Sequence, residues 1–157
     1  MTDLRPALKL RAATEHDAEI LLEWRNDPTT REMSQTSTPV TRATHMAWLH
    51  NALSNDKCLI FIAEDNGDPV GMVRLDVDRD GKAAEVSINI APHARNKKLA
   101  ASLLHIAHTH MAANASGIKM LTARIKTGNT QSERAFERAG YTQVREEHGY
   151  NFYEVAL

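Results

Sequence analysis

The sequence predicts a single domain of the α/β (α+β) class, with helices on both faces of a mixed sheet. Strand-like and helix-like hydrophobic periods alternate along its 157 residues. Three consecutive strand patterns are joined by short turn signals, which favours antiparallel pairing. Later strand patterns are separated by helix patterns, which favours parallel crossovers. We therefore expect one domain over 1–157, with about seven mostly antiparallel strands.

The first third of the chain predicts one strand and two helices. Apolar and basic side chains alternate in the strand, as they do when one face is buried. Thr14 precedes an acidic turn and an apolar helical face, and Pro28 stops that helix. The second helix begins at Thr41 or Thr44, because either hydroxyl can cap it. The expected elements are a strand over 8–12, a helix over 15–25, a loop over 27–42 and a helix that ends at 53.

The remainder of the chain predicts six strands and two helices. An Asn-Gly pair at 66–67 and an Asp-Gly pair at 80–81 are typical of tight hairpin turns. Pro92 ends a strand, and Gly117 and Gly140 fit the left-handed caps that follow helices. The expected elements are strands over 58–64, 70–77, 84–91, 119–126, 141–146 and 150–157, and helices over 96–115 and 130–139.

The composition argues against several classes of protein. There are 19 Lys and Arg against 20 Asp and Glu, and a net charge of -1 lacks the basic excess of a nucleic-acid binder. No apolar run could cross a membrane and the N-terminus lacks a signal peptide, so we expect a cytoplasmic protein without a membrane partner.

Cys58 is the only cysteine, so it should be a buried thiol. His105 and His108 share a predicted helix with no carboxylate at ligand spacing, so no metal is expected.

A basic turn between the strand that ends at Pro92 and the next helix has the clearest functional signal. The first N–H groups of a helix lack partners and lie at its positive end, where a phosphate can bind. Arg95, Lys97 and Lys98 add positive charge, and the small residues that follow let a ligand approach the backbone. The turn is therefore a candidate pyrophosphate site. A solvated basic turn in front of a surface helix is the alternative.

This turn resembles the coenzyme A-binding motif of the GNAT superfamily of acetyl-CoA-dependent N-acetyltransferases. The family pattern, Gln/Arg-x-x-Gly-x-Gly/Ala after a strand and a proline, is matched at 95–100 with Lys98 in place of the middle glycine. The lysine side chain must then point away from the cofactor, or the turn must shift. The resemblance implies a GNAT fold, acetyl-CoA as co-substrate and no metal. It assigns cofactor contacts to Ile88, Asn89, Ile90, Arg95, Asn96, Lys97, Lys98, Leu99, Ala100 and Ala101.

A second resemblance lies at 129–141, which matches the family segment Asn-x-x-Ser/Ala-x-x-x-Tyr-x-x-x-Gly-Phe/Tyr. It implies that Asn129 contacts the cofactor, although an asparagine here also suits a helix cap. In the family, a tyrosine at the position of Phe136 often protonates the departing thiolate. The resemblance therefore implies that Phe136 contacts the cofactor but has no proton to give. The general acid is therefore left open among Tyr141, Ser132 and solvent.

A third resemblance concerns the acceptor. The segments Trp-Arg-Asn-Asp-Pro at 24–28 and His-Met-Ala-Trp at 45–48 are similar to signatures of GNAT members that acetylate nucleotide-linked amino sugars, as in the pseudaminic-acid pathway. Ribosomal-protein N-terminal acetyltransferases share a looser version. From the residues alone, both tryptophans would belong to the core and the arginine to the surface. The resemblance instead implies acceptor contacts from Trp24, Arg25, Asn26 and Trp48.

Acetylation of an amine by a thioester requires a neutral amine, a hydrogen-bond donor for the carbonyl oxygen and alignment of the two substrates. The resemblance implies that the strand before the basic turn splays from its neighbour and supplies the donor from its backbone. Glu85 lies on the polar face of this strand and can take the amine proton directly or through water, with an ion pair as the alternative role. His45 is the competing base, with a hydrogen bond that orders the helix connection as its alternative role.

These features predict an N-acetyltransferase that moves an acetyl group from acetyl-CoA to a primary amine by direct attack, with a UDP-linked amino sugar as the favoured acceptor. A protein N-terminus or a small amine is the rival acceptor. Lys98 and Phe136 leave open a non-catalytic acyl-CoA sensor. Arg124, Lys126 and Arg134 are either phosphate contacts or surface charges. The sequence leaves the oligomeric state open, a homodimer included.

Overall fold

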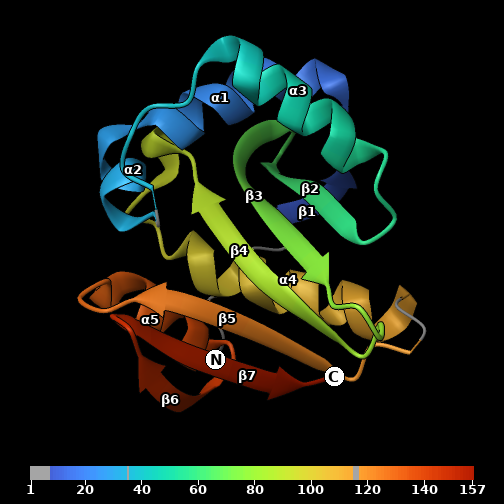
Figure 1. The fold of residues 1–157 in the computed structure, drawn as a ribbon, viewed down its shortest axis with the longest axis vertical. Helices are drawn as coiled ribbons and strands as arrows, with labels where there is room; N and C mark the ends of the chain where they lie inside the picture. Colours follow the sequence, from blue (N-terminus) through green and yellow to red (C-terminus); the bar gives the residue numbers. More distant parts are fainter. Residues whose placement is uncertain (1–7, 35, 115–116) are drawn as a thin grey trace.

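A seven-stranded sheet runs through the computed structural model, which describes residues 8–34, 36–114 and 117–157 (Figure 1). The strands follow the order β1-β2-β3-β4-β5-β7-β6. β4 and β5 are parallel, and the other neighbouring pairs are antiparallel, as the sequence predicts. The strands are β1 Leu8–Ala12, β2 Cys58–Asp65, β3 Asp68–Val77, β4 Ala83–Ile90, β5 Met120–Lys126, β6 Thr142–Glu147 and β7 Tyr150–Ala156.

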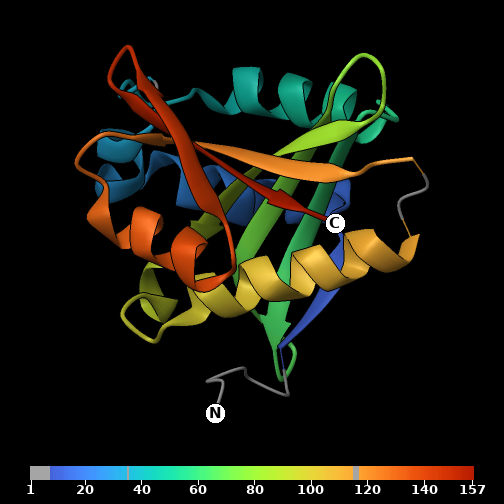
Figure 2. The same cartoon turned by 90° about the horizontal axis from the view of Figure 1, so that it is seen from below.

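Helices cover both faces of this sheet. α1 and α3 pack together over one face, whereas α4 crosses the other face and contacts α5 (Figures 1 and 2). This arrangement confirms the predicted mixed sheet with helices on both faces. The α-helices are α1 Ala18–Asn26, α2 Pro28–Met33, α3 Arg42–Leu53, α4 Leu99–Asn114 and α5 Thr130–Arg138, with 3-10 turns at Glu15–Asp17 and Pro92–Ala94.

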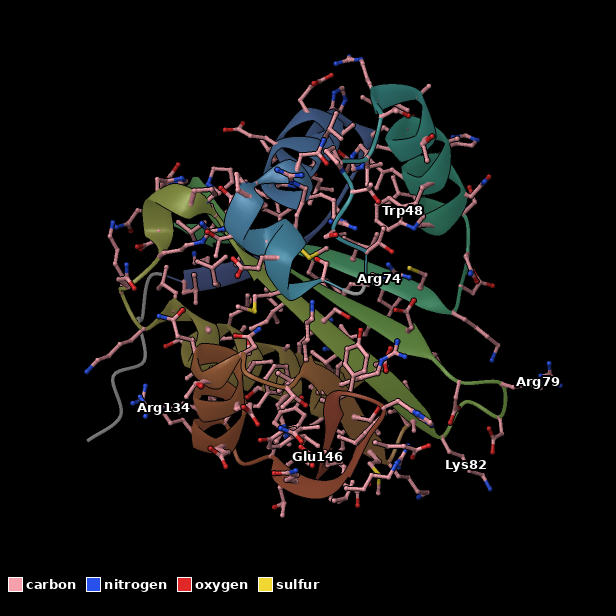
Figure 3. The ribbon with its side chains drawn as sticks, turned by 60° about the vertical axis from the view of Figure 1, so that its left-hand side comes forward. Trp48, Arg74, Arg79, Lys82, Arg134 and Glu146 are labelled. Atoms are coloured by element: carbon pink, nitrogen blue, oxygen red, sulfur yellow. The ribbon has the colours of Figure 1, made fainter. Side chains whose placement is uncertain are left out.

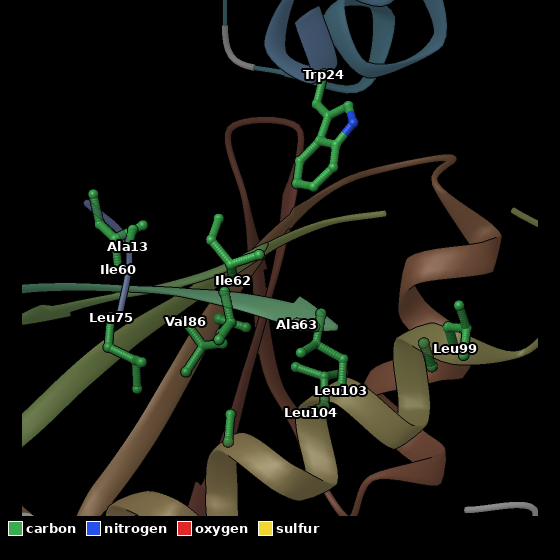
Figure 4. Packing of buried hydrophobic residues seen from close by; sticks show 14 of the residues in the cluster. Ala13, Trp24, Ile60, Ile62, Ala63, Leu75, Val86, Leu99, Leu103 and Leu104 are labelled. Atoms are coloured by element: carbon green, nitrogen blue, oxygen red, sulfur yellow. The ribbon is translucent and has the colours of Figure 1, made fainter. Parts of the chain in front are cut away.

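The hydrophobic core lies between the sheet and these helices. Trp24 extends from α1 toward the strands, while Leu103 and Leu104 of α4 approach them from the other side (Figure 4). Ile62 and Leu75, on the strands themselves, are fully buried. Burial of one such side chain stabilises the fold by roughly 1.5–3 kcal/mol relative to its exposure. Trp24 is therefore a core residue, as its apolar character alone predicts.

The segment predicted as a loop over 27–42 contains a helix, α2. The Asp27 carboxylate accepts hydrogen bonds from the N–H groups of Thr29 and Thr30 at 3.1 and 3.3 Å. Pro28 occupies the first helical position, where the N–H that it lacks would have no partner. The prediction of a continuous loop is wrong at this point, because Pro28 both stops α1 and begins α2.

The helix predicted to begin at residue 96 begins at Leu99. Asn96 and Lys98 have φ angles of 62° and 58°. Backbone in this left-handed region cannot continue a right-handed α-helix. Residues 95–98 therefore form a separate turn between β4 and α4. The predicted end of the helix, at residue 115, lies outside the described residues.

The two parallel strands separate soon after they meet. β4 and β5 pair only between 83–85 and 120–122. β4 nevertheless continues to Ile90 and β5 to Lys126, and the two ribbons diverge over this length (Figure 1). The edge of β4 that faces β5 is therefore left without a sheet partner, beside the start of α4.

Candidate active site

The free edge of β4 presents backbone groups to the opening between β4 and β5. The N–H of Ala91 donates to the Val70 carbonyl at 2.8 Å, in register with the β3–β4 pairing. In an antiparallel pair, residues that bond to the partner strand alternate with residues whose backbone groups point away. Asn89 therefore bonds toward β3, while Ile88 and Ile90 direct their N–H and C=O groups into the opening.

A cleft of about 510 Å³ extends from this edge along the start of α4. Its cationic residues are Arg95, Lys98, Arg134 and Arg138, and no carboxylate lines it among the described residues. Figure 3 shows Arg134 projecting from α5. Such a lining suits the phosphates of coenzyme A. Of the predicted cofactor residues, those that line the cleft are Ile88, Asn89, Ile90, Arg95, Asn96, Lys98, Leu99, Ala100, Ala101 and Asn129; Lys97 and Phe136 do not.

The turn before α4 has the backbone conformation that glycine favours. Lys98, with a φ of 58°, stands where the family motif has its middle glycine. The left-handed geometry is therefore kept with a lysine in place, at a cost of about 1 kcal/mol. Lys98 is exposed and lines the cleft, so the replacement adds a positive charge there.

Arg95 joins the cofactor turn to α2. Its Nη2 donates to Asp27 Oδ2 at 2.6 Å and to Thr30 Oγ1 at 3.0 Å. Thr30 Oγ1 donates in turn to Asn89 Oδ1 at 3.2 Å. The hydrogen bond from Arg95 holds the pKa of Asp27 below its usual value, so this carboxylate is ionised at neutral pH. Asp27 therefore caps α2 and holds Arg95 in place.

A second cavity, of about 420 Å³, lies between the sheet and the helices α1 and α3. It shares Thr30, Ser34, Ile88 and Asn89 with the basic cleft described above. The two spaces therefore meet at β4. A molecule in one cavity would approach a molecule in the other at the backbone of Ile88.

Arg25 and Trp48 line this second cavity. The Arg74 guanidinium lies 5.3 Å from the centre of the Trp48 ring, and its Nε is 2.9 Å from Asp76 Oδ2. Trp48 and Arg74 lie next to each other in Figure 3. Arg25 Nη2 donates to the Thr36 carbonyl at 3.3 Å. This part of the cavity wall is therefore both aromatic and cationic.

His45 also lines the second cavity and is 3% exposed. Its Nε2 lies 2.9 Å from the carbonyl oxygen of Ala18. Because a carbonyl can only accept, Nε2 bears the proton and Nδ1 keeps a lone pair. Burial lowers the pKa of His45, so the ring is neutral at pH 7 and can accept a proton. The same hydrogen bond fastens α3 to the start of α1.

Glu85 lines neither cavity. It lies where β4 still pairs with β5, opposite Thr122, and its Oε1 is 3.7 Å from Nη2 of Arg124. Ser87, which lines the second cavity, is two residues further along β4, or roughly 7 Å away. A base at Glu85 would therefore need water to reach an amine in the cavity.

Trp24 and Asn26 are not brought into either cavity. Trp24 is 4% exposed in the core. Asn26 Oδ1 accepts from the Val40 N–H at 2.7 Å, and its Nδ2 donates to the Val40 carbonyl at 2.9 Å. Asn26 therefore fastens the segment before α3 to the end of α1, and both its amide oxygen and its amide nitrogen are bonded to Val40.

The aromatic residues of the segment at 129–141 face the core. Phe136 is 3% exposed and packs edge-on against Tyr141, with ring centres 4.9 Å apart. The Tyr141 hydroxyl is buried without a hydrogen-bond partner among the described residues, and burial raises its pKa. Ser132 lines the cofactor cleft, as does Asn129, which caps α5 by accepting from the Ser132 N–H at 3.3 Å. Cofactor contact and helix capping are therefore compatible at Asn129.

The structure adds α2 and β3 to the site. An Asp-Pro pair at 27–28 is a typical helix start, and this signal could have revealed α2. No pattern along the chain indicates that Arg74 of β3 borders the second cavity, because that depends on which strands lie beneath α1 and α3. The residues of α2 and its C-cap that line one or both cavities are Thr29, Thr30, Met33 and Ser34.

Comparison with protein families decides the classification. The model of the acetyltransferase (GNAT) domain matches residues 7–142. The chain belongs to the GNAT acetyltransferase family. This membership confirms the GNAT fold and the acetyl-CoA-dependent N-acetyltransferase that the motifs predict. Comparison with curated proteins finds no match.

Solved structures with the fold of this GNAT domain act on different acceptors. An aminoglycoside acetyltransferase, AAC(6')-Ib, in complex with paromomycin and acetyl-CoA, is 21% identical with a TM-score of 0.81, over 94% of this chain and 92% of that chain. Spermidine N-acetyltransferase from Vibrio cholerae, with CoA and spermine, is 15% identical with a TM-score of 0.84, over 96% and 95%. A ribosomal L7/L12 α-N-protein acetyltransferase with coenzyme A is 14% identical with a TM-score of 0.83, over 97% and 95%.

Within residues 8–34, 36–114 and 117–157, no group of three or more His, Cys, Asp or Glu side chains could hold a metal ion. In the same part of this GNAT domain, no helix combines the length and the apolar character needed to cross a membrane. Cys58 is buried and free, in agreement with the prediction of a core thiol.

Proposed function

We propose that this GNAT domain transfers the acetyl group of acetyl-CoA to the primary amine of a nucleotide-linked amino sugar. The observation that carries the proposal is the meeting of two cavities at β4, where the basic cleft and the second cavity share Ile88 and Asn89. The second cavity contains Arg25 and Trp48, from the segments that resemble nucleotide-sugar acetyltransferases. An aromatic ring and a guanidinium suit a sugar or base ring and a diphosphate.

The chain contributes alignment and hydrogen bonds to this reaction. When bound, acetyl-CoA supplies an activated acetyl group as a thioester. Ile88 and Ile90 direct backbone N–H groups into the opening, where they can donate to the pantetheine arm and to the carbonyl oxygen as it gains negative charge. Holding both substrates against one strand edge can lower the barrier by several kcal/mol. The amine attacks the thioester carbonyl directly: the C–N bond forms, the C–S bond then breaks, and coenzyme A leaves as a thiolate that takes a proton from solvent or from Ser132 in the cleft. The buried Cys58 has no part in this attack.

His45 is the proposed base, and Glu85 is the rival. The Nδ1 lone pair of His45 belongs to a neutral ring in the wall of the second cavity, which we call the acceptor cavity because the proposal places the amine there. Glu85 would act through water from the point where β4 and β5 part. The acceptor ammonium must lose a proton before it attacks, so kcat/KM should depend on whichever group accepts that proton.

Thiol release from acetyl-CoA, measured with a panel of amines, tests the proposal. The panel contains a UDP-linked 4-amino sugar, a peptide with a free N-terminus, kanamycin and spermine; structural neighbours were solved with the last two. Release that depends on the UDP-linked sugar supports the proposal. Release with another amine alone would replace the acceptor and keep the acetyl transfer. Binding of acetyl-CoA, measured by calorimetry, without thiol release with any amine would favour the sensor function. Phe136 agrees with that function, because it has no hydroxyl to protonate a departing thiolate and lies in the core.

Two matched variants separate the candidate bases. His45→Gln keeps a donor for the Ala18 carbonyl but cannot accept a proton, and should lower kcat by roughly 10²–10⁴-fold. Glu85→Gln keeps the size of the side chain and should leave kcat unchanged. The reverse result would assign the base to Glu85 through water. Unchanged turnover in both variants would leave neither residue as the base.

A further inference from the structure

The acceptor cavity contains a positive charge that no acidic residue of its described lining compensates. Arg25 and Arg74 line it, and among the described residues no Asp or Glu does so. Burial lowers the pKa of His45, so this ring adds no charge at neutral pH. Arg74 pairs with Asp76, Nε to Oδ2 at 2.9 Å. The charge that remains is that of Arg25.

Arg25 lacks a partner for part of its guanidinium. Its Nη2 donates to the Thr36 carbonyl at 3.3 Å, which is long for such a bond. Its Nη1 is buried and has no hydrogen-bond partner among the described residues. A buried donor on a charged group is costly when it is unpaired. An anionic oxygen of a bound molecule would supply the missing partner.

The backbone on both sides of Arg25 is held in place. Trp24 is fixed in the core, and Asn26 is fastened to Val40 by two hydrogen bonds. The planar guanidinium presents donors in a fork that matches the paired oxygens of a carboxylate or a phosphate. The backbone that carries this cation is therefore fixed before any acceptor binds.

We infer that the acceptor bears an anionic group, a phosphate or a carboxylate, which Arg25 binds while the amine faces β4. The inference rests on the proposed function, whose acceptor cavity it uses, and it assigns the recognition of the acceptor's negative charge to Arg25. A polyamine would bring more positive charge to a cavity whose described lining has no carboxylate, so it should be a poor acceptor. A neutral amino sugar should also be poor, because it leaves Arg25 unpaired.

Acceptors that differ in their anionic group alone test this inference. A 4-amino sugar 1-phosphate and the methyl glycoside of the same sugar test for a phosphate. Alanine and alaninamide test for a carboxylate, and spermidine is the cationic comparison. We expect kcat/KM for one anionic acceptor to exceed that for its neutral partner by about 10- to 100-fold. Equal values within both pairs, or a preference for spermidine, would overturn the inference and leave acetyl transfer intact.

Variants of Arg25 locate the effect. Arg25→Gln should lower kcat/KM for the preferred anionic acceptor by about 10- to 100-fold, mainly through KM, and leave the neutral partner unchanged. Arg25→Lys should restore part of the loss. Arg79→Gln is the control, because Arg79 is exposed in the turn after β3 and lies apart from Trp48 and Arg74 (Figure 3). An equal loss for both members of a pair would mean that Arg25 supports the fold and does not bind the anion.

Calorimetry tests the anion site without catalysis. Absence of thiol release with every amine would refute the proposed function. Anion binding at Arg25 can still be measured in that case. Protein saturated with coenzyme A is titrated with UDP and with alanine. Binding of one of them that weakens at least about tenfold in Arg25→Gln supports the inference. Absence of binding by both, or equal binding in the variant, overturns it.

Discussion

Replacing Lys98 by glycine should stabilise this domain, although it removes a side chain and adds backbone freedom. Lys98 has a φ of 58° in the turn before α4. The left-handed conformation costs a residue with a Cβ about 1–2 kcal/mol, and glycine adopts it freely. Glycine also gains entropy in the unfolded chain, which costs about 0.4–1 kcal/mol on folding. The net expectation is a gain of about 0.5–1 kcal/mol, or roughly 1–4 °C in Tm for a chain of this length.

The neighbouring Lys97 provides a matched control. It has the same side chain and charge and is also exposed, but it is not among the residues with positive φ. Lys97→Gly should therefore lose about 0.4–1 kcal/mol through the unfolded chain alone. The free energies of unfolding of the two variants should thus differ by about 1–2 kcal/mol, which is the cost of the left-handed lysine.

Urea unfolding and calorimetric melting of both variants without coenzyme A measure this difference. Lys98→Gln is the third variant, since it removes the charge and keeps the backbone cost. Equal destabilisation by Lys98→Gly and Lys97→Gly would refute the reasoning, because it would mean that residue 98 does not occupy the left-handed region. In binding assays, Lys98→Gly and Lys98→Gln should weaken coenzyme A alike, because both lose the same charge in the cleft.

Three other substitutions probe the acceptor side and the free edge of β4. Gly71→Ala should lower the free energy of unfolding by about 1–3 kcal/mol and weaken acetyl-CoA binding in calorimetry, because its Cβ would lie 2.9 Å from the backbone oxygen of Asn89. Asn26→Ala should cost about 1–3 kcal/mol in urea unfolding, because both backbone groups of Val40 lose their partner. Burial lowers the pKa of His45 in the folded state, so protonation favours the unfolded chain. The free energy of unfolding should therefore fall as the pH drops below the unfolded pKa of about 6.5. His45→Gln should reduce this fall, measured as urea midpoints at several pH values.

Each of these expectations has an outcome that contradicts it. A free energy of unfolding equal to that of wild type in Gly71→Ala would mean that the Asn89 backbone oxygen does not lie 2.9 Å from the position of the added Cβ. Asn26→Asp keeps the side-chain acceptor for the Val40 N–H and loses the donor, so its free energy of unfolding should lie between those of wild type and Asn26→Ala. A loss as large as that of Asn26→Ala would mean that the acceptor does not stabilise the fold. An unchanged pH dependence in His45→Gln would assign the acid sensitivity to other groups.

Local patterns determine the secondary elements of this protein. Apolar alternation at 8–12 and 84–91 predicts strands because successive strand residues point to opposite faces. Thr41 caps α3, accepting a hydrogen bond from the Thr44 N–H, as one of the two predicted starts requires. The basic turn and Asn129 are also predicted as cofactor residues from short motifs, since each motif lies within a single connection. The opening at β4 followed from the family resemblance, and neither it nor the order of the strands in the sheet could be derived from periodicity.

The fate of individual site residues depends on tertiary structure. Trp24, Arg25 and Asn26 are adjacent, yet they reach the core, the acceptor cavity and Val40 respectively, because successive helical residues point about 100° apart. Glu85 and Ser87 share one face of β4, but the strands still pair at the first and have parted at the second.

The sequence by itself therefore determined the order of the elements other than α2, the basic turn and the family, because each depends on residues close together along the chain. Tertiary structure alone decided that Arg74 of β3 borders the second cavity, that Arg95 is held by Asp27, and that Phe136 turns to the core. These outcomes depend on how helices rotate and where strands part, and both are set by packing between segments that lie far apart in the sequence.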